Sequence, residues 1–352
     1  MRALVLAGGE GSRLRPLTHT QAKQLIPIAG QPILFHALDA VAGAGIREVG
    51  IVLGQTGPEV RAAVGDGSRW GVDVTYIEQE APLGIAHAVM TASGFVRGEP
   101  FLLYLGDNVL LEGVERFIRT FETSRPNAAI LLARVPDPSQ FGVVVLERGR
   151  VVRLVEKPRE FVSEVALVGV YLFDDSILEA CATLRPSWRG EYEITEAIQW
   201  LVDNGKTVGA EMVDGYWKDT GRPEDLLEAN RMLLAAHEPA IEGSIDSTST
   251  IEGRVAVGAG TTVKGSRLIG PVVIGAGCDI NRSTIGPDVS IGSDCTVAES
   301  VIRDSIVMEG CSIQSVSTLA ASVLGRSVDV IHVDGRGAHR LVVGDRSRIE
   351  VD

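Results

Sequence analysis

The stretch RALVLAGGEGSRLRPLTHTQAKQL occupies residues 2–25, and it begins as a continuous apolar run that ends in two glycines. A strand that is apolar on both faces is typical of a parallel sheet covered by helices on both sides. Further apolar runs follow up to about residue 235, separated by segments with helical spacing. This alternation predicts an α/β domain with a Rossmann-like, mostly parallel sheet, which binds ligands beyond the carboxyl ends of its strands.

The individual elements of this domain can be read from the same periodicity. We expect strands within 2–9, 48–54, 72–79, 100–108, 128–135, 142–147, 149–158 and 164–174. We expect helices within 31–45, 58–65, 84–95, 193–205 and 222–238.

A different period begins after about residue 240. From Ile251 to Val330 an apolar residue returns every five or six positions, and a glycine commonly follows it, as in VGAGTTV, IGAGCDI and IGPDVSI. No helix keeps this period, whereas hexapeptide repeats build a left-handed parallel β-helix whose coils stack their aliphatic side chains. We therefore divide the chain into a first domain of residues 1–238 and a β-helix domain of residues 245–352 that ends in a strand pair. We expect the first domain to bind its ligand without the second.

Composition excludes several classes of protein. The formal net charge of -13 argues against a nucleic-acid polymer as partner, because binding to a phosphate backbone needs clustered Lys and Arg. There is no apolar run long enough to cross a bilayer and no signal-peptide pattern, so we expect a cytoplasmic protein without membrane contact. The four cysteines lack C-x-x-C spacing and are expected to be buried, reduced thiols.

The glycine loop after the first strand has three interpretations. A dinucleotide fingerprint would place a third glycine where Leu14 stands, and a P-loop pattern has no match. The third interpretation is a loop whose backbone N–H groups wrap the phosphates of a small ligand, with Arg13 and Lys23 as counter-charges. An ordinary turn with solvated arginines remains an alternative at this point.

The stretches LAGGEGSRLRPLT and AKQLIPIAGQPIL together resemble the signature of sugar-1-phosphate nucleotidylyltransferases, most closely that of glucose-1-phosphate thymidylyltransferases. Glu10, Ser12 and Ala22 are mild departures from the usual pattern. The resemblance continues at EQEAPLGIAHA, YLGDN, FGVV, EKP, VGVYLFD, GEYEITE and YWKDTGRPEDLLEAN, and the trailing repeats look like the long form of this family, found in deoxysugar biosynthesis. It implies that residues 1–238 are a nucleotidyltransferase catalytic domain that transfers a thymidylyl group from dTTP to glucose 1-phosphate and releases pyrophosphate.

The resemblance also implies roles for individual residues. The catalytic residues would be Arg13, Lys23, Asp107 and Lys157. The nucleotide would be bound by Gly8, Gly9, Gly11, Ser12, Arg13, Lys23, Gln24, Gln79, Gly84 and Asp107. The sugar phosphate would be bound by Asn108, Gly142, Glu156, Lys157, Val168, Tyr171 and Trp217. Asp107 and Asp219 would hold Mg²⁺, which prefers carboxylate oxygens together with substrate phosphates.

These roles suit the chemistry, because two anions must meet and the enzyme has to neutralise charge and fix geometry. Each residue taken alone has an ordinary structural alternative, such as a turn for Asp107 or a surface ion pair for Glu156 and Lys157.

Three other functions stay open. One keeps the fold and changes the nucleotide, giving a uridylyltransferase or another sugar-1-phosphate nucleotidylyltransferase. The second is an acyltransferase, because hexapeptide β-helices often host acyl transfer, although residues 251–330 contain no histidine to act as base. The third is a non-catalytic regulatory subunit. We also expect a homo-oligomer, since a β-helix offers exposed flanks for subunit contact.

Overall fold

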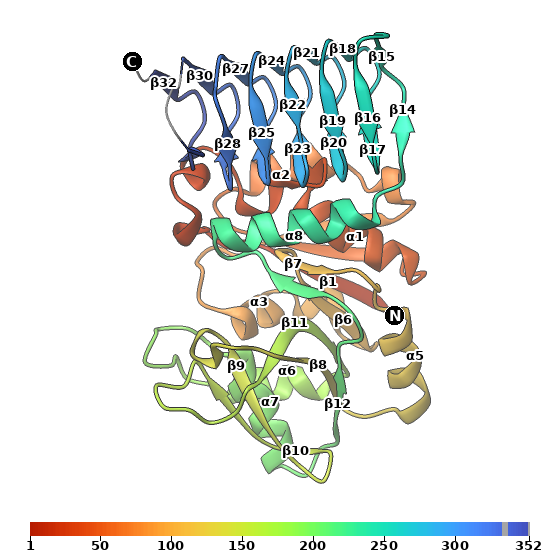
Figure 1. Cartoon of the computed structure of the whole chain (residues 1–352). Helices are drawn as coiled ribbons and strands as arrows, with labels where there is room; N and C mark the ends of the chain where they lie inside the picture. The colour runs from red at the N-terminus through yellow and green to blue at the C-terminus, as the bar shows by residue number, and fades with distance from the viewer. Residues whose placement is uncertain (333–336, 351–352) are drawn as a thin grey trace. The chain divides into compact units, whose positions relative to one another are not determined.

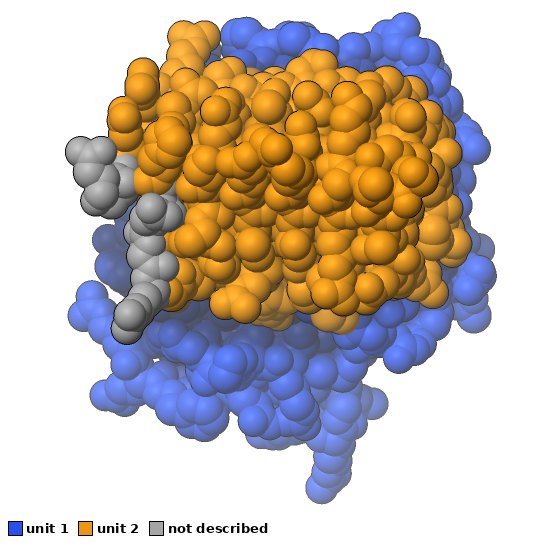
Figure 2. All heavy atoms as spheres, turned by 45° about the horizontal axis from the view of Figure 1, so that its top comes forward, with its two compact units in different colours: residues 1–10, 34–219 blue, residues 11–33, 220–352 orange. Residues whose placement is uncertain are grey.

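The computed structural model describes residues 1–332 and 337–350 (Figure 1). The chain forms two compact units, each built from two separate parts of the sequence (Figure 2). Unit 1 contains residues 1–10 and 34–219, and unit 2 contains residues 11–33 and 220–352. These borders do not coincide with the predicted boundary at 238–245, which stays a prediction. Residues 351–352, at the end of the predicted β-helix domain, lie outside the described residues.

Unit 1 is built on a nine-stranded sheet of order β10-β9-β11-β6-β1-β4-β5, from which β8 and β12 branch at β11. The neighbours β5, β4, β1 and β6 run parallel as predicted, whereas β11 is antiparallel to β6, β8 and β9. The strands are β1 (Arg2–Ala7), β4 (Glu48–Leu53), β5 (Asp73–Glu78), β6 (Phe101–Leu105), β8 (Ala128–Arg134), β9 (Gly142–Glu147), β10 (Arg150–Glu156), β11 (Val165–Phe173) and β12 (Val208–Met212).

Helices bury the apolar faces of this sheet. They are α1 (Ile33–Gly43), α2 (Gly57–Val64), α3 (Ile85–Thr91), α4 (Ser93–Val96), α5 (Glu115–Ser124), α6 (Ser176–Thr183) and α7 (Ile194–Asp203). One core joins residues from β1, β6 and β11 to α3, α6 and α7, among them Leu4, Phe101 and Phe173. All strands and helices expected here are confirmed. Periodicity did not predict α5, α6, β12 or a small antiparallel pair formed by β7 (Asn108–Leu110) and β13 (Trp217–Asp219).

Unit 2 contains the predicted parallel β-helix, whose three sheets are consistent with the left-handed form. The first sheet contains β14 (Ala240–Ile241), β17 (Val255–Val257), β20 (Val272–Ile274), β23 (Val289–Ile291), β26 (Ser305–Val307), β29 (Val323–Leu324) and β31 (Val342–Val343). The second contains β15 (Ser244–Ile245), β18 (Thr262–Lys264), β21 (Asp279–Asn281), β24 (Thr296–Ala298), β27 (Ser312–Gln314), β30 (Asp329–Ile331) and β32 (Arg348–Glu350). The third contains β16 (Thr250–Glu252), β19 (Arg267–Ile269), β22 (Thr284–Ile285), β25 (Val301–Arg303) and β28 (Leu319–Ala320). The tail strands β31 and β32 do not pair with each other. Each adds in parallel to the preceding coil, so the tail is a further coil rather than a strand pair.

The interior of the β-helix is apolar and regular. Cys278, Cys295 and Cys311 occupy equivalent places in successive coils and are free, buried thiols, as expected. Each thiol donates to a backbone carbonyl of the next coil, and Thr261 does the same from the coil before them. These hydrogen bonds satisfy carbonyl groups that the coil corners would leave unpaired.

The rest of unit 2 packs on the outer side of the first sheet. It consists of α8 (Pro223–Ala236) and of residues 11–33, which form η1 (Ser12–Leu14), η2 (Leu17–His19), η3 (Lys23–Leu25), β2 (Pro27–Ile28) and β3 (Gln31–Pro32). Arg231 of α8 makes a two-pronged ion pair with Asp304, at 2.6 and 2.8 Å. In the described part of the chain, no helix has the length and apolarity needed to span a membrane.

Candidate functional site

The first half of the glycine loop lies in unit 1, where β1 ends. Gly8 meets the end of the neighbouring strand β4: a Cβ added at Gly54 would lie 2.6 Å from the Gly8 carbonyl oxygen. Any side chain at position 54 would therefore separate the two strand ends. Gly9 follows and is exposed.

The second half of the loop lies in unit 2 and starts at Gly11. Gly11 has φ 65°, and a Cβ there would lie 2.9 Å from Lys23 Cβ and from Thr18 Cγ2. The missing side chain lets the buried stem of Lys23, which is 6 % exposed, pack against the loop. The Thr18 hydroxyl donates to the Gly11 carbonyl at 2.7 Å and closes the turn. The guanidinium group of Arg13 lies against Gly221, where a Cβ would be 2.7 Å from its Nη2.

Gln24 has the features of a ligand-binding amide. It is 2 % exposed, and its Oε1 has no hydrogen-bond partner among the described residues. A buried acceptor without a partner destabilises the fold unless a ligand or water donates to it. The N–H group of a nucleotide base is a suitable donor.

Asp107, Asn108, Trp217 and Asp219 come together in unit 1 where β7 pairs with β13. Asp219 stands opposite Asn108 in the register. The Asn108 amide donates to Asp107 Oδ1 at 2.9 Å, and its oxygen accepts from Trp217 Nε1 at 2.7 Å. Asn108 is buried, so these bonds fix the orientation of its side chain and steady the carboxylate beside it. The pair of strands thus presents two carboxylates from distant parts of the sequence.

Glu156 is the last residue of β10 and Lys157 follows it, and their neighbourhood is strongly polar. Glu156 Oε1 lies 3.9 Å from Lys157 Nζ and 3.4 Å from Arg189 Nη1, and the Thr195 hydroxyl donates to Oε2 at 3.2 Å. Burial raises the pKa of Glu156, and the nearby Glu193 adds to that rise. Lys157, Arg189 and the Thr195 hydroxyl oppose it.

Gly142, Tyr171 and Val168 complete this part of unit 1. A Cβ at Gly142 would lie 3.0 Å from Glu156 Oε2, so the glycine backbone passes directly beside the carboxylate. Burial raises the pKa of Tyr171, and both Glu156 and Asp107 contribute. Tyr171 therefore lies within electrostatic range of both carboxylates. Val168 is a fully buried residue of β11.

Gln79 and Gly84 lie together in a second loop of unit 1. Gln79 Nε2 lies 3.3 Å from the Gly84 carbonyl oxygen and 2.9 Å from His87 Nδ1. Gly84 has φ 101°, and a Cβ there would lie 2.6 Å from the Tyr192 carbonyl oxygen. Only glycine fits this close approach of two backbone segments.

Sequence reasoning missed several residues of these clusters. Arg189 makes ion pairs with Glu156, Glu191 and Glu193. In the sequence alone, an arginine in a loop is interpreted as a charge exposed to solvent. Tyr192 links its segment to the Gln79 loop, because its N–H donates to the Leu83 carbonyl at 2.7 Å. The signal was the position of Arg189 directly before the GEYEITE motif.

The predicted residues are therefore divided between the units. Unit 2 contains Gly11, Ser12, Arg13, Lys23 and Gln24, and the other predicted residues belong to unit 1. In unit 2 the contacts above join Gly11 to Lys23. In unit 1 they form three clusters, one around Gln79 and Gly84, one around Asp107 and Asn108, and one around Gly142 and Glu156. Across the described residues, no set of three or more His, Cys, Asp and Glu side chains is arranged to hold a metal ion.

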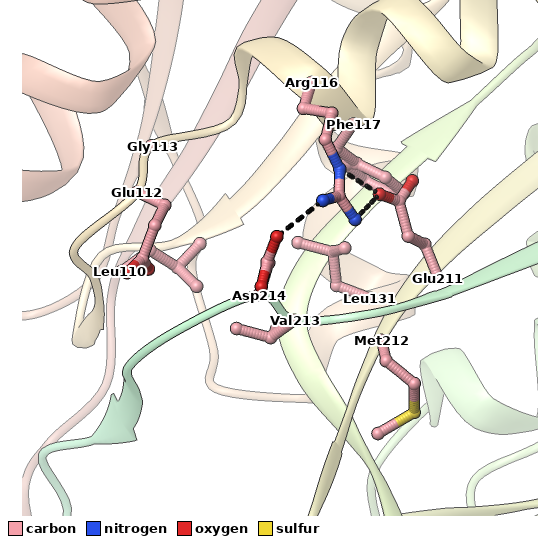
Figure 3. Close-up of a pocket in the computed structure, with 10 residues that line it drawn as sticks. All are labelled: Leu110, Glu112, Gly113, Arg116, Phe117, Leu131, Glu211, Met212, Val213 and Asp214. Carbon is pink, nitrogen blue, oxygen red and sulfur yellow. Dashed lines mark hydrogen bonds and ion pairs between the residues drawn. The ribbon is translucent and has the colours of Figure 1, made fainter.

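A cavity of about 230 Å³ in unit 1 lies beyond these clusters (Figure 3). Arg116 reaches between Glu211 and Asp214 there, with 2.7 Å hydrogen bonds to each (Figure 3). With Glu112 also in the lining, carboxylates outnumber the guanidinium group, which disfavours a phosphate-bearing ligand. The lining consists of Leu110, Glu112, Gly113, Arg116, Phe117, Leu131, Glu211, Met212, Val213 and Asp214, none of which is a predicted site residue.

Comparison with known proteins gives consistent results. The nucleotidyl transferase family profile matches residues 2–236. A glucose-1-phosphate thymidylyltransferase of Streptomyces griseus is 50 % identical over 353 residues, covering 100 % of this chain and 99 % of the relative. One of Streptomyces antibioticus is 50 % identical over 354 residues with the same coverage. A Bacillus anthracis crystal structure assigned as a glucose-1-phosphate thymidylyltransferase superposes with a TM-score of 0.62 and 33 % identity, over 66 % of this chain and 94 % of that one.

Proposed function

Since the chain belongs to the nucleotidyl transferase family, we propose that it transfers the thymidylyl group of dTTP to glucose 1-phosphate, giving dTDP-glucose and pyrophosphate. The observation that carries the proposal is the acceptor cluster of unit 1, where Lys157 and Arg189 place two cations beside the partly buried Glu156. Such a cluster can hold a sugar phosphate by its phosphate and its hydroxyl groups together. The similarity to the two Streptomyces thymidylyltransferases supports the choice of dTTP and glucose.

In the proposed reaction, a phosphate oxygen of glucose 1-phosphate attacks the α-phosphorus of dTTP in line. The new O–Pα bond forms as the bond to the β-phosphate oxygen breaks, and pyrophosphate leaves. Lys157 holds the acceptor phosphate, and Glu156 accepts from a sugar hydroxyl. Arg13 and Lys23 neutralise the phosphates of the nucleotide and of the leaving pyrophosphate.

The base of the nucleotide would be read by amide groups. Gln24 offers a buried oxygen that lacks a donor, and the N–H of thymine supplies one. Gln79 and Gly84 provide the second part of the base site, with the Gln79 amide oriented by His87. Thymine and uracil share these hydrogen-bonding groups, so we expect measurable but weaker use of UTP. A single methyl group discriminates by roughly 10- to 200-fold.

Asp107 and Asp219 fit a magnesium ion. Asp219 is the last residue of β13, and Asp107 directly precedes the paired strand β7, where the Asn108 amide fixes one oxygen of Asp107. Magnesium commonly takes one or two protein carboxylates and completes its shell with water and substrate phosphates. When bound, it supplies positive charge against the α-phosphate and the leaving group.

The test is an assay with purified protein, glucose 1-phosphate and magnesium, with dTTP, UTP or GTP in parallel arms. Pyrophosphate release is followed, and the nucleotide sugar is identified by mass spectrometry. We expect dTDP-glucose as the main product and a kcat/KM order of dTTP, then UTP, then GTP. A preference for UTP would establish the uridylyltransferase alternative, and no release in any arm would favour a regulatory subunit.

We also propose that the enzyme acts in the cytoplasm, because nucleoside triphosphates and sugar phosphates are intracellular substrates. We further propose that it is a homo-oligomer, because a β-helix offers exposed flanks for subunit contact. Light scattering on the purified protein would measure the subunit number, and a monomer at assay concentration would contradict the proposal.

A further inference from the structure

Residues 11–33 run along the β-helix across several of its coils. The Thr20 hydroxyl donates to Asp345 Oδ2 at 2.8 Å in the last coil. The next residue, Gln21, is buried and donates from Nε2 to the Met308 sulfur at 3.2 Å, two coils earlier. The loop therefore crosses from one coil to another within two residues of its own sequence.

The other end of the loop is fixed on the first coils. Ala29 belongs to an apolar cluster with Val273 and Leu234, and its N–H donates to Asn230 Oδ1 at 2.8 Å. The following Gly30 passes so close to the β-helix that an added Cβ would lie 3.0 Å from Val273 Cγ1. Thr20–Gln21 and Ala29–Gly30 are thus two anchor points, in opposite halves of the first sheet.

Lys23 and Gln24 lie between these anchor points, in the single turn of η3. One 3₁₀ turn has too few hydrogen bonds to hold its side chains in place by itself. Both side chains are nonetheless buried, so the loop that carries them has to be held on both sides of the turn. The β-helix holds it through Thr20 and Gln21 before the turn and through Ala29 and Gly30 after it.

We propose that the β-helix is the platform that positions the nucleotide-binding loop, through the contacts Thr20–Asp345 and Gln21–Met308. This inference rests on the proposed function, since it assigns the positioning of Lys23 and Gln24 toward dTTP. Thr20, Gln21, Met308 and Asp345 are positioning residues in this scheme, because they act on the substrate only through the loop.

Two variants of the full chain test the platform from its two sides. Thr20→Val removes the hydroxyl that reaches Asp345, and Met308→Leu removes the sulfur acceptor at nearly constant volume. We expect each to raise the KM for dTTP by roughly 2- to 10-fold, the range for one neutral hydrogen bond, with little change in the KM for glucose 1-phosphate. Hydrogen–deuterium exchange of residues 16–31 should accelerate in both, while residues 262–331 stay protected apart from the site of Met308 itself.

Two controls make the result specific. Thr20→Ser keeps the hydroxyl and should behave as wild type. Thr296→Val makes the same change as Thr20→Val on an exposed position of β24 and should alter neither the KM for dTTP nor exchange in the loop.

Wild-type KM for dTTP and wild-type exchange in residues 16–31 for both variants would overturn the proposal. So would an equal rise of both KM values with faster exchange throughout the β-helix, because that marks general destabilisation. If wild-type protein formed no nucleotide sugar, the proposed function would fail separately. The exchange measurement needs no turnover and would still decide whether the β-helix holds the loop.

Discussion

Replacing Gly142 with alanine perturbs the acceptor cluster at a known point. A Cβ there would lie 2.5 Å from Thr195 Cγ2 and 3.0 Å from Glu156 Oε2. Carbon atoms in contact stay about 3.5–4.0 Å apart, so Thr195 has to retreat by about 1 Å. Rotation about its χ1 angle is the smallest such movement, and it carries Oγ1 away from Glu156, to which it now donates at 3.2 Å.

The expected cost follows from these distances. Overpacking of this size destabilises a protein by about 1–3 kcal/mol. A displacement of about 1 Å in a binding site lowers turnover by up to roughly 10²-fold. We therefore expect Gly142→Ala to lower kcat/KM for glucose 1-phosphate by about 10- to 100-fold and to change the KM for dTTP much less. Initial rates of pyrophosphate release and the Tm measure the two effects.

A second substitution decides whether the reasoning is right. Thr195→Ser removes Cγ2 and keeps the hydroxyl, so the double variant should recover most of the lost kcat/KM and Tm. Gly209→Ala is a matched control, because its nearest neighbour would lie 3.6 Å from the new Cβ. If the double variant regained its Tm but not its kcat/KM for glucose 1-phosphate, the added methyl itself would obstruct the sugar, and the link through Thr195 would be refuted.

Three further predictions address the metal, the charge and the base. Asp107→Asn and Asp219→Asn should each lower kcat by about 10²–10³, with partial rescue by added magnesium, and the double variant should lose less than the product because both act through one ion. The fold raises the pKa of Glu156, so ionisation of this carboxyl lowers the free energy of unfolding as pH rises from 4.5, the pKa in the unfolded chain, through the higher pKa in the folded one. Urea unfolding should therefore show Glu156→Gln gaining stability relative to wild type between pH 4 and pH 7.5. A difference in unfolding free energy that stays constant with pH would contradict this. Gln79→Ala should reduce the kcat/KM preference for dTTP over GTP more than it alters the KM for glucose 1-phosphate, and an unchanged preference would remove Gln79 from the base site.

The repeat spacing predicted the β-helix because each aliphatic position must return to the same interior face. Its detail could not be predicted until the length of a coil was known. Cys278 lies 17 residues after Thr261, and this interval is the length of one coil. Only the coil length shows that the two side chains hold equivalent places, from which each donates to a backbone carbonyl of the next coil. The strand pair of β7 and β13 was missed because strands of three residues carry too little periodicity to stand out.

The candidate site was predictable where a residue type and a motif coincide, as at Gly11 and Lys23. It was not predictable where the partner is distant in sequence. Arg189 had no visible partner before the fold placed Glu156 beside it. The sequence also suggested that residues 1–238 would bind nucleotide alone. The packing of residues 11–33 on the β-helix argues against that expectation, because such a fragment would lose the contacts of Thr20, Gln21 and Gly30 with the coils.

The contact between Thr20 and Asp345 joins residues 325 positions apart, which has a consequence during protein synthesis. At about 5–20 residues per second, the ribosome needs roughly 15–65 s after Thr20 to make Asp345. Throughout that time Thr20 lacks its partner in the last coil, and Gln21 lacks Met308 for most of it, so the first part of the loop is not yet held in place. Long-range contacts of this kind also slow folding, since the chain must close a large loop before it gains their energy. The segment that leaves the ribosome first is therefore among the last to reach its native place.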